Sequence, residues 1–244
     1  MLLLLPLVFG GCSVLRGAQL WAPESYGLEW AAPGLYVETG MATQQRTEMV
    51  AAMAWAETAI RRAYGEVLST PIVNACMSEA CYKRFGGKGS MAKVYGNRIL
   101  ISPRGLNGHF IAHEWSHAEL QKRLTLSGYF RLPSWFDEGV AVAVSEAPEH
   151  SEAHWQYLES HNVPRPDRVE LMSLQSLSQW LDAVHRYGEH LNPQRMARGE
   201  PRVAPVYGAA GHEIRPWLAV AGTAGLLSVI DALNVGDDFT TVYR

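Results

Sequence analysis

The feature that most constrains the fold is the stretch H-E-W-S-H at residues 113–117, which has the pattern H-E-x-x-H. Two histidines four residues apart lie on one face of an α-helix, about 6 Å apart along its axis. From that face both imidazoles can reach a single Zn²⁺ ion at roughly 2.0–2.1 Å. The pattern therefore predicts a helix over this stretch, with His113 and His117 as metal ligands.

Two glutamates complete the candidate site. Glu114 adjoins the first ligand and projects beside the metal, which suits a base that takes a proton from an attacking water. Glu138 lies in W-F-D-E-G at residues 135–139, on the next predicted helix, and is the candidate third ligand. Three protein ligands leave a fourth position for water or substrate, which is the arrangement of a catalytic zinc.

The residues around the motif favour a helix that starts just before it. Asn107 is a plausible N-cap, the run to Arg123 is amphipathic, and Gly128 follows the predicted end. The metzincin form of the motif needs a glycine and a third histidine shortly afterwards. Leu120 and Arg123 stand at those places, so that form is excluded.

The motif and the downstream run L-P-S-W-F-D-E-G-V-A together resemble the gluzincin metallopeptidases. They are most similar to a bacterial branch in which a W-x-x-E-G-x-A helix carries the third ligand. The resemblance implies His113, His117 and Glu138 as zinc ligands and Glu114 as general base. Val142 stands where the thermolysin-like subgroup has an acidic residue, so that subgroup fits poorly.

The resemblance also implies a fold. It predicts an α+β, zincin-like domain over residues 34–244, with a sheet-containing lobe at 34–105 and a mostly helical lobe at 106–244. In such proteins a tyrosine on a C-terminal helix donates a hydrogen bond to the developing oxyanion, and Tyr207 is the matching position. An edge strand lies along the cleft and pairs with the substrate backbone, and residues 98–102 are the candidate for it.

The N-terminus suggests export. Residues 2–9 form an apolar run that is too short to span a bilayer and has the length of a signal-peptide core. Gly10, Gly11 and Cys12 follow, and small residues before a cysteine resemble a bacterial lipoprotein signal. Residues 1–12 are thus a predicted signal with lipidation at Cys12, and residues 13–33 a predicted tether. A plain secretory signal and a buried N-terminal strand are the alternatives.

The cysteines fit the same compartment. If Cys12 is lipidated, Cys76 and Cys81 remain as an even pair, and an exported chain meets oxidising conditions in which a short-loop disulfide persists. A structural zinc site needs about four ligands, and there is no second cysteine pair to complete one.

Composition narrows the function classes. The chain has 244 residues, 48% of them hydrophobic, and a net charge of −3. This is enough for one domain with a real core, and the lack of a basic stripe argues against a nucleic-acid partner. No run of ~20 apolar residues is apparent after the start, so no internal transmembrane helix is predicted.

Several segments keep two interpretations. Residues 192–205 form either an inert surface loop, which is favoured, or a lid. We interpret His150, His154 and His161 as surface histidines; metal ligation is the less favoured alternative. Asp137 either orients a ligand histidine or is a plain solvated residue, and the second interpretation is slightly preferred.

These patterns predict a zinc-dependent metallopeptidase that acts on peptide or protein substrates and is exported and anchored to the membrane through a lipid. The alternative is a cell-envelope binding or assembly lipoprotein that keeps a peptidase-like scaffold with little or no proteolysis. A structural zinc that staples two helices is a third interpretation, weakened because only three ligands are evident.

Overall fold

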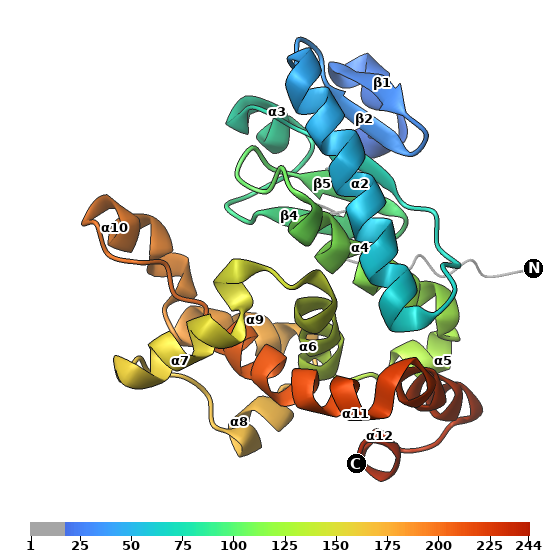
Figure 1. The fold of residues 1–244 in the computed structure, drawn as a ribbon, viewed down its shortest axis with the longest axis vertical. Coiled ribbons are helices and arrows are strands. Elements are labelled where there is room, and N and C mark those ends of the chain that lie inside the picture. Colours follow the sequence, from blue (N-terminus) through green and yellow to red (C-terminus); the bar gives the residue numbers. More distant parts are fainter. Residues whose placement is uncertain (1–17) are drawn as a thin grey trace, which may run out of the picture.

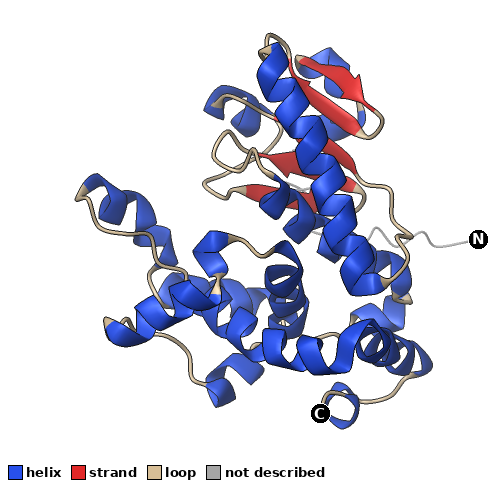
Figure 2. Ribbon diagram, viewed as in Figure 1, coloured by secondary structure: helices blue, strands red, loops and turns tan. Residues whose placement is uncertain are grey.

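The structure, a computed structural model, describes residues 18–244 (Figure 1). The predicted signal segment, Cys12 and the first residues of the predicted tether lie outside the described residues. The chain forms an upper part that contains the sheet and a lower part built from helices. Figure 2 shows that the strands are confined to the upper part. The α+β class expected from the sequence is confirmed.

The sheet has five strands in the order β1-β2-β3-β5-β4. Their bounds are Leu28–Ala32 for β1, Leu35–Glu38 for β2, Ile72–Ala75 for β3, Ala92–Tyr95 for β4 and Arg98–Ile101 for β5. The central pairs β2/β3 and β3/β5 are parallel, and the outer pairs β1/β2 and β4/β5 are antiparallel hairpins. The sheet is therefore mixed, with β1 and β4 as its edges.

The helices follow in chain order. The upper part contains α2 (Thr43–Tyr64), α3 (Glu79–Arg84) and α4 (Gly108–Arg123). The lower part contains α5 (Leu126–Tyr129), α6 (Ser134–Ser145), α7 (Glu152–Ser160), α8 (Arg168–Met172), α9 (Leu177–Arg186), α10 (Asn192–Ala197), α11 (Pro205–Val235) and α12 (Phe239–Val242). Within residues 18–244, four short 3₁₀ helices, η1 to η4, lie at Ala18–Trp21, Pro23–Tyr26, Pro148–His150 and Glu189–Leu191.

Strand β5 shows how the sheet divides the core. Successive side chains of a strand point to opposite faces. Ile99 and Ile101 join the large cluster that includes residues of α2, α4 and α6, whereas Leu100 joins a smaller cluster with η1, β1 and α3. The sheet thus has a buried cluster on each face. Helix α4, which carries the H-E-x-x-H residues, packs on the face with the larger cluster.

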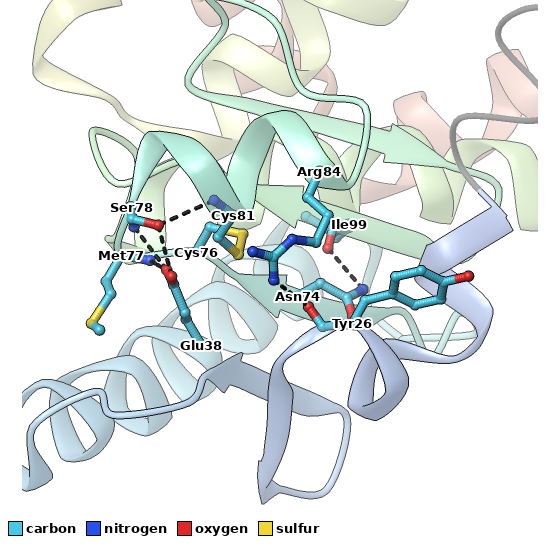
Figure 3. The surroundings of a disulfide bond; sticks show 9 residues. All are labelled: Tyr26, Glu38, Asn74, Cys76, Met77, Ser78, Cys81, Arg84 and Ile99. Atoms are coloured by element: carbon cyan, nitrogen blue, oxygen red, sulfur yellow. Dashed lines mark hydrogen bonds between the residues drawn. A yellow bond between two sulfur atoms is a disulfide. The ribbon is translucent and has the colours of Figure 1, made fainter.

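The smaller cluster contains a disulfide between Cys76 and Cys81, the two cysteines that the sequence predicts to pair (Figure 3). Both residues are buried. Beside them the Glu38 carboxylate accepts hydrogen bonds from the backbone N–H groups of Met77 and Ser78 and from the Ser78 hydroxyl. This loop between β3 and α3 is therefore fixed by both a covalent bond and a carboxylate.

The tether predicted for residues 13–33 is wrong from residue 18 onward. This stretch contains η1, η2 and β1, and Leu20 and Leu28 are buried in the smaller cluster. Its glycines and prolines shape turns instead of a flexible leader: Gly27, for example, ends η2 in the left-handed conformation, with φ 86°.

Two further predictions are wrong. Residues 98–102 are not an edge strand, because β5 lies between β3 and β4 and the free edge belongs to β4. Residues 192–205 are not a loop throughout, because they begin with helix α10. Asn192 at its start is buried and clamps Val203, donating to its carbonyl at 2.7 Å and accepting from its N–H at 2.9 Å.

Helix α11 is long and apolar enough to cross a membrane by length and composition alone, with a mean hydropathy of 1.7 over its most apolar window. Small residues such as alanine and glycine are frequent in this stretch. The helix packs along α6, and at Gly222, with φ 59° and ψ −166°, it breaks into two parts.

Candidate metal centre

Helix α4 holds the H-E-x-x-H residues at a fixed height against the sheet. Asn107 caps it, as predicted, by accepting a hydrogen bond from the Phe110 N–H at 3.2 Å. The residues between the two histidines face inward: Trp115 donates to the Ser69 hydroxyl at 3.0 Å, and Ser116 shares a 2.8 Å hydrogen bond with the Tyr64 hydroxyl. With Trp115 and Ser116 held in this way, the two histidines face Glu138 of α6.

Helix α6 supplies Glu138, the candidate third ligand. It starts after Pro133, and its Trp135 and Phe136 are buried among the aromatic residues of the lower part. Gly139, next to Glu138, lies against α11: a Cβ atom there would stand 2.6 Å from the Ile214 side chain and 3.0 Å from the Ala210 carbonyl oxygen. A glycine is required where the two helices cross, and this close contact fixes the position of the neighbouring Glu138 along α6.

The structure brings His113, His117 and Glu138 together, with one ligand atom of each within 4.8 Å of the others. Oε2 of Glu138 lies 3.3 Å from Nε2 of His113 and 3.7 Å from Nε2 of His117. Ligands at 2.0–2.1 Å around a tetrahedral ion stand about 3.3 Å apart. The three atoms are thus spaced as the ligands of one small cation would be.

The same carboxylate oxygen is buried and has no hydrogen-bond partner among the described residues. An isolated buried carboxylate oxygen is costly unless it is paired or coordinates a metal. The donor set of two imidazoles and one carboxylate suits a divalent transition metal. The residues present therefore fit a metal ion.

Asp137 lies beside the cluster and not within it. Nδ1 of His117 donates a hydrogen bond to Asp137 Oδ1 at 2.7 Å, which leaves Nε2 free to act as a ligand. The preferred interpretation of Asp137 as a plain solvated residue is therefore wrong. Burial alone would lower the pKa of His117, but the charges of Asp137 and Glu138 outweigh it and raise that pKa to about 10.

Glu114 is positioned differently. Its carboxylate makes no hydrogen bond to the residues that the structure describes, and it lines a cavity beside the cluster. Burial raises the pKa of Glu114, the nearby imidazoles of His113 and His117 act against this rise, and the charge of Glu138 adds to it. A carboxylate with raised pKa and no internal partner is suited to exchanging a proton with a ligand in the cavity.

The cavity has a volume of about 390 Å³ and lies between the two parts of the molecule. Its walls come from the residues before β4, from α4, η3, α9 and η4, and from the start of α11. Tyr207 is among them, with its ring centroid 6.1 Å from that of His113. Burial and the charges of Glu138 and Glu189 raise the pKa of Tyr207 well above its usual value, so the phenol stays protonated and can donate.

Other polar residues of this wall include His150, which the sequence analysis treated as a surface residue, and Glu189 and Arg202, which it did not single out. His150 stacks on Tyr207, with ring centroids 4.9 Å apart, and burial lowers its pKa well below the usual value. None of the three belongs to a motif, because each comes from a short connecting segment whose place only the tertiary fold determines. The preference for treating His150 as a surface residue is wrong, since it is buried.

The remaining candidates lie elsewhere. His154 accepts a hydrogen bond from the Ala204 N–H at 3.0 Å, and His161 bonds within its own helix end. The Sγ atoms of Cys76 and Cys81 lie near the Glu38 carboxylate, but the disulfide occupies both. A larger cavity of about 580 Å³, beside Trp155 and Arg168, does not reach the metal cluster.

Comparison with models of protein families, with curated proteins and with solved structures finds no match to this chain.

Proposed function

We propose that the protein is a zinc-dependent metallopeptidase with a zincin-like fold. The observation that carries the proposal is the buried Glu138 oxygen without a hydrogen-bond partner, which lies 3.3 Å and 3.7 Å from the Nε2 atoms of His113 and His117, close to the spacing of metal ligands. Glu114 stands next to this cluster at the wall of a cavity. A binding or assembly protein without catalytic activity would not need a carboxylate without hydrogen bonds, such as that of Glu114, at this position.

Each residue then has a task. His113, His117 and Glu138 would hold the ion, and a zinc ion so held supplies Lewis acidity to a water molecule and to a carbonyl group. Glu114 takes the proton of the attacking water and returns it to the leaving amine. Tyr207 donates its hydroxyl proton in a hydrogen bond to the oxyanion that develops on the scissile carbonyl.

Strand β4 gives a place for an extended substrate. It is an edge strand, so one side of its backbone is unpaired in the sheet, and α4 lies against it. Lys93 of β4 lies close enough to Glu114 for the two charges to interact. Burial lowers the pKa of Lys93, and the attraction of the Glu114 carboxylate partly offsets this. A peptide added to this edge would pass Glu114, and main-chain pairing gives affinity with little sequence preference.

Two measurements test the proposal. Purified protein should contain one zinc ion per chain, and it should cleave a peptide library in a reaction that a chelator abolishes and added zinc restores. The double variant His113→Ala, His117→Ala should lose both the metal and the cleavage. Full zinc stoichiometry in that variant would refute the ligand assignment. Absence of any cleavage by zinc-loaded wild type would favour the alternative of a binding or assembly protein.

We also propose that the enzyme is exported and held at a membrane through a lipid on Cys12. The disulfide between Cys76 and Cys81 supports this location, because disulfides persist in oxidising compartments. Fractionation and lipid labelling of wild type and Cys12→Ala test it. Equal cytoplasmic pools without label in both would contradict export and anchoring together.

A further inference from the structure

Arg202 is the only lysine or arginine among the described residues that line the cavity beside the metal cluster. Its side chain is partly buried and makes neither an ion pair nor a hydrogen bond to the described residues, and its Nε is fully buried without a partner. A partly buried guanidinium without an internal partner is poorly stabilised. A ligand in the cavity that paired with its terminal nitrogens would supply the missing partner.

The backbone that presents Arg202 is fixed on its C-terminal side. Val203 is clamped by two hydrogen bonds to the buried Asn192, and the Ala204 N–H donates to His154. Helix α11 begins at the next residue. A guanidinium on a fixed backbone loses less conformational entropy on binding a ligand than one on a mobile loop, because only its side chain must be ordered.

The wall carboxylate whose charge acts on Arg202 makes no ion pair with it. Glu189 is tied to the start of α11, where its Oε1 accepts the Val206 N–H at 2.9 Å. Burial raises the pKa of Glu189 to about 8, and the backbone hydrogen bond and the charge of Arg202 act against the rise. Glu189 therefore serves the helix end, and the N–H groups of Arg202 stay free.

The apolar part of the wall strengthens a charge pair at this place. Met91, Phe110, Leu181 and Val184 are apolar and line the same cavity. An apolar wall lowers the local dielectric constant, so that opposite charges attract more strongly than in water. A planar guanidinium also matches a carboxylate with two parallel hydrogen bonds.

We propose that Arg202 binds a carboxylate of the substrate, so that the enzyme cleaves peptides near a negative charge. This inference rests on the proposed peptidase function. A sphere of 390 Å³ is about 9 Å across, which corresponds to roughly two or three residues of extended chain at ~3.3 Å each. The carboxylate is thus within about three residues of the scissile bond, either as the free C-terminus or as an acidic side chain.

The test uses matched peptides and an arm that does not depend on cleavage. One set differs only in a free or an amidated C-terminus, and a second set of amidated peptides differs in Glu or Gln at each position. Wild type, Arg202→Gln and Arg202→Lys are compared for kcat and KM on both sets. Zinc-loaded Glu114→Gln, with and without Arg202→Gln, reports binding of the same peptides by fluorescence anisotropy.

We expect Arg202→Gln to raise the KM of carboxylate-bearing peptides about ten- to a hundredfold, with kcat nearly unchanged, and to abolish their advantage over neutral partners. Arg202→Lys should keep part of the preference. Arg198→Gln is the control, because Arg198 lies on the same segment but is exposed and paired with Glu200. Zinc content and thermal stability identify variants that have merely unfolded.

The outcomes separate the sources and the two proposals. A preference for the free C-terminus identifies the terminal carboxylate, and a preference for Glu in amidated peptides identifies a side chain. If neither set discriminates in cleavage or in binding, the role of Arg202 is refuted. If no peptide is cleaved, the peptidase proposal fails, and the binding arm still decides whether Arg202 recognises a carboxylate.

Discussion

Helix α4 carries two glutamates five residues apart, and the structure treats them in opposite ways. Glu119 is fully buried and accepts hydrogen bonds from the Leu68 and Ser69 N–H groups, from the Ser69 hydroxyl and from Arg123 Nε. Glu114 lies at the cavity and has no such bond among the described residues. A carboxylate whose partners are all internal holds the fold together, whereas one without internal partners is available to a ligand.

The largest expected effect tests the available carboxylate. Glu114→Gln is near-isosteric but cannot take a proton from the attacking water, so peptide cleavage should fall by at least about 10²–10⁴-fold. Because the ligands are untouched, the variant should keep its zinc and its thermal stability. Steady-state kinetics with metal analysis checks this, and wild-type kcat in the variant would show that Glu114 is not the base.

The matched substitution at the other glutamate should affect folding. Glu119→Ala leaves Arg123 and two backbone N–H groups without their acceptor, and breaking a buried ion pair in this way typically costs about 3–5 kcal/mol. Urea unfolding measures the loss. Protein that remains folded should keep one zinc and its activity, so a specific loss of cleavage at unchanged stability would erase the contrast between the two residues.

Asp137 sharpens the comparison at the metal. Its hydrogen bond to Nδ1 of His117 orients that imidazole, and removal of such a partner typically lowers metal affinity by about 10–100-fold. Asp137→Asn should therefore bind zinc more weakly, and Glu138→Gln more weakly still. Competition with a fluorescent chelator gives both affinities. An Asp137→Asn affinity equal to that of wild type would make the hydrogen bond incidental.

The smallest effect concerns the pH dependence of stability. Burial raises the pKa of Glu189 to about 8 in the folded chain, above its usual value of 4.5. The folded state then binds more protons than the unfolded state between these values, so the free energy of unfolding should fall as pH rises from about 4.5 to about 8. Glu189→Gln should flatten this decline. An unchanged slope in urea unfolding at several pH values would contradict it.

The sequence predicted the helices of the site better than their surroundings. Local signals were enough for α4 and its Asn107 cap, and the spacing of the motif gave ligands that the structure brings together. The edge strand was misplaced because a hairpin does not reveal which of its strands pairs with β3. His150, Glu189 and Arg202 lie on short connections, and no periodicity marks a residue whose position depends on distant helices.

Asp137 shows a subtler reason for a miss. Neighbouring helix residues point about 100° apart, so only one of Asp137 and Glu138 can face the metal, and the motif selects Glu138. Orienting a ligand histidine was one of the two interpretations of Asp137, but the sequence does not show which histidine nitrogen it would reach. His117 extends between the two helices, and its Nδ1 reaches the residue that its Nε2 does not.

The contact between α6 and α11 has a consequence for mutational tolerance. Gly139 and Gly211 face the opposite helix, and a Cβ on Gly211 would stand 2.5 Å from the Val142 side chain. The helix that bears Glu138 and the helix that bears Tyr207 are therefore in contact through positions that accept no side chain. A saturation screen for activity should find these two glycines as intolerant as the ligands themselves, although neither has a chemical group to contribute.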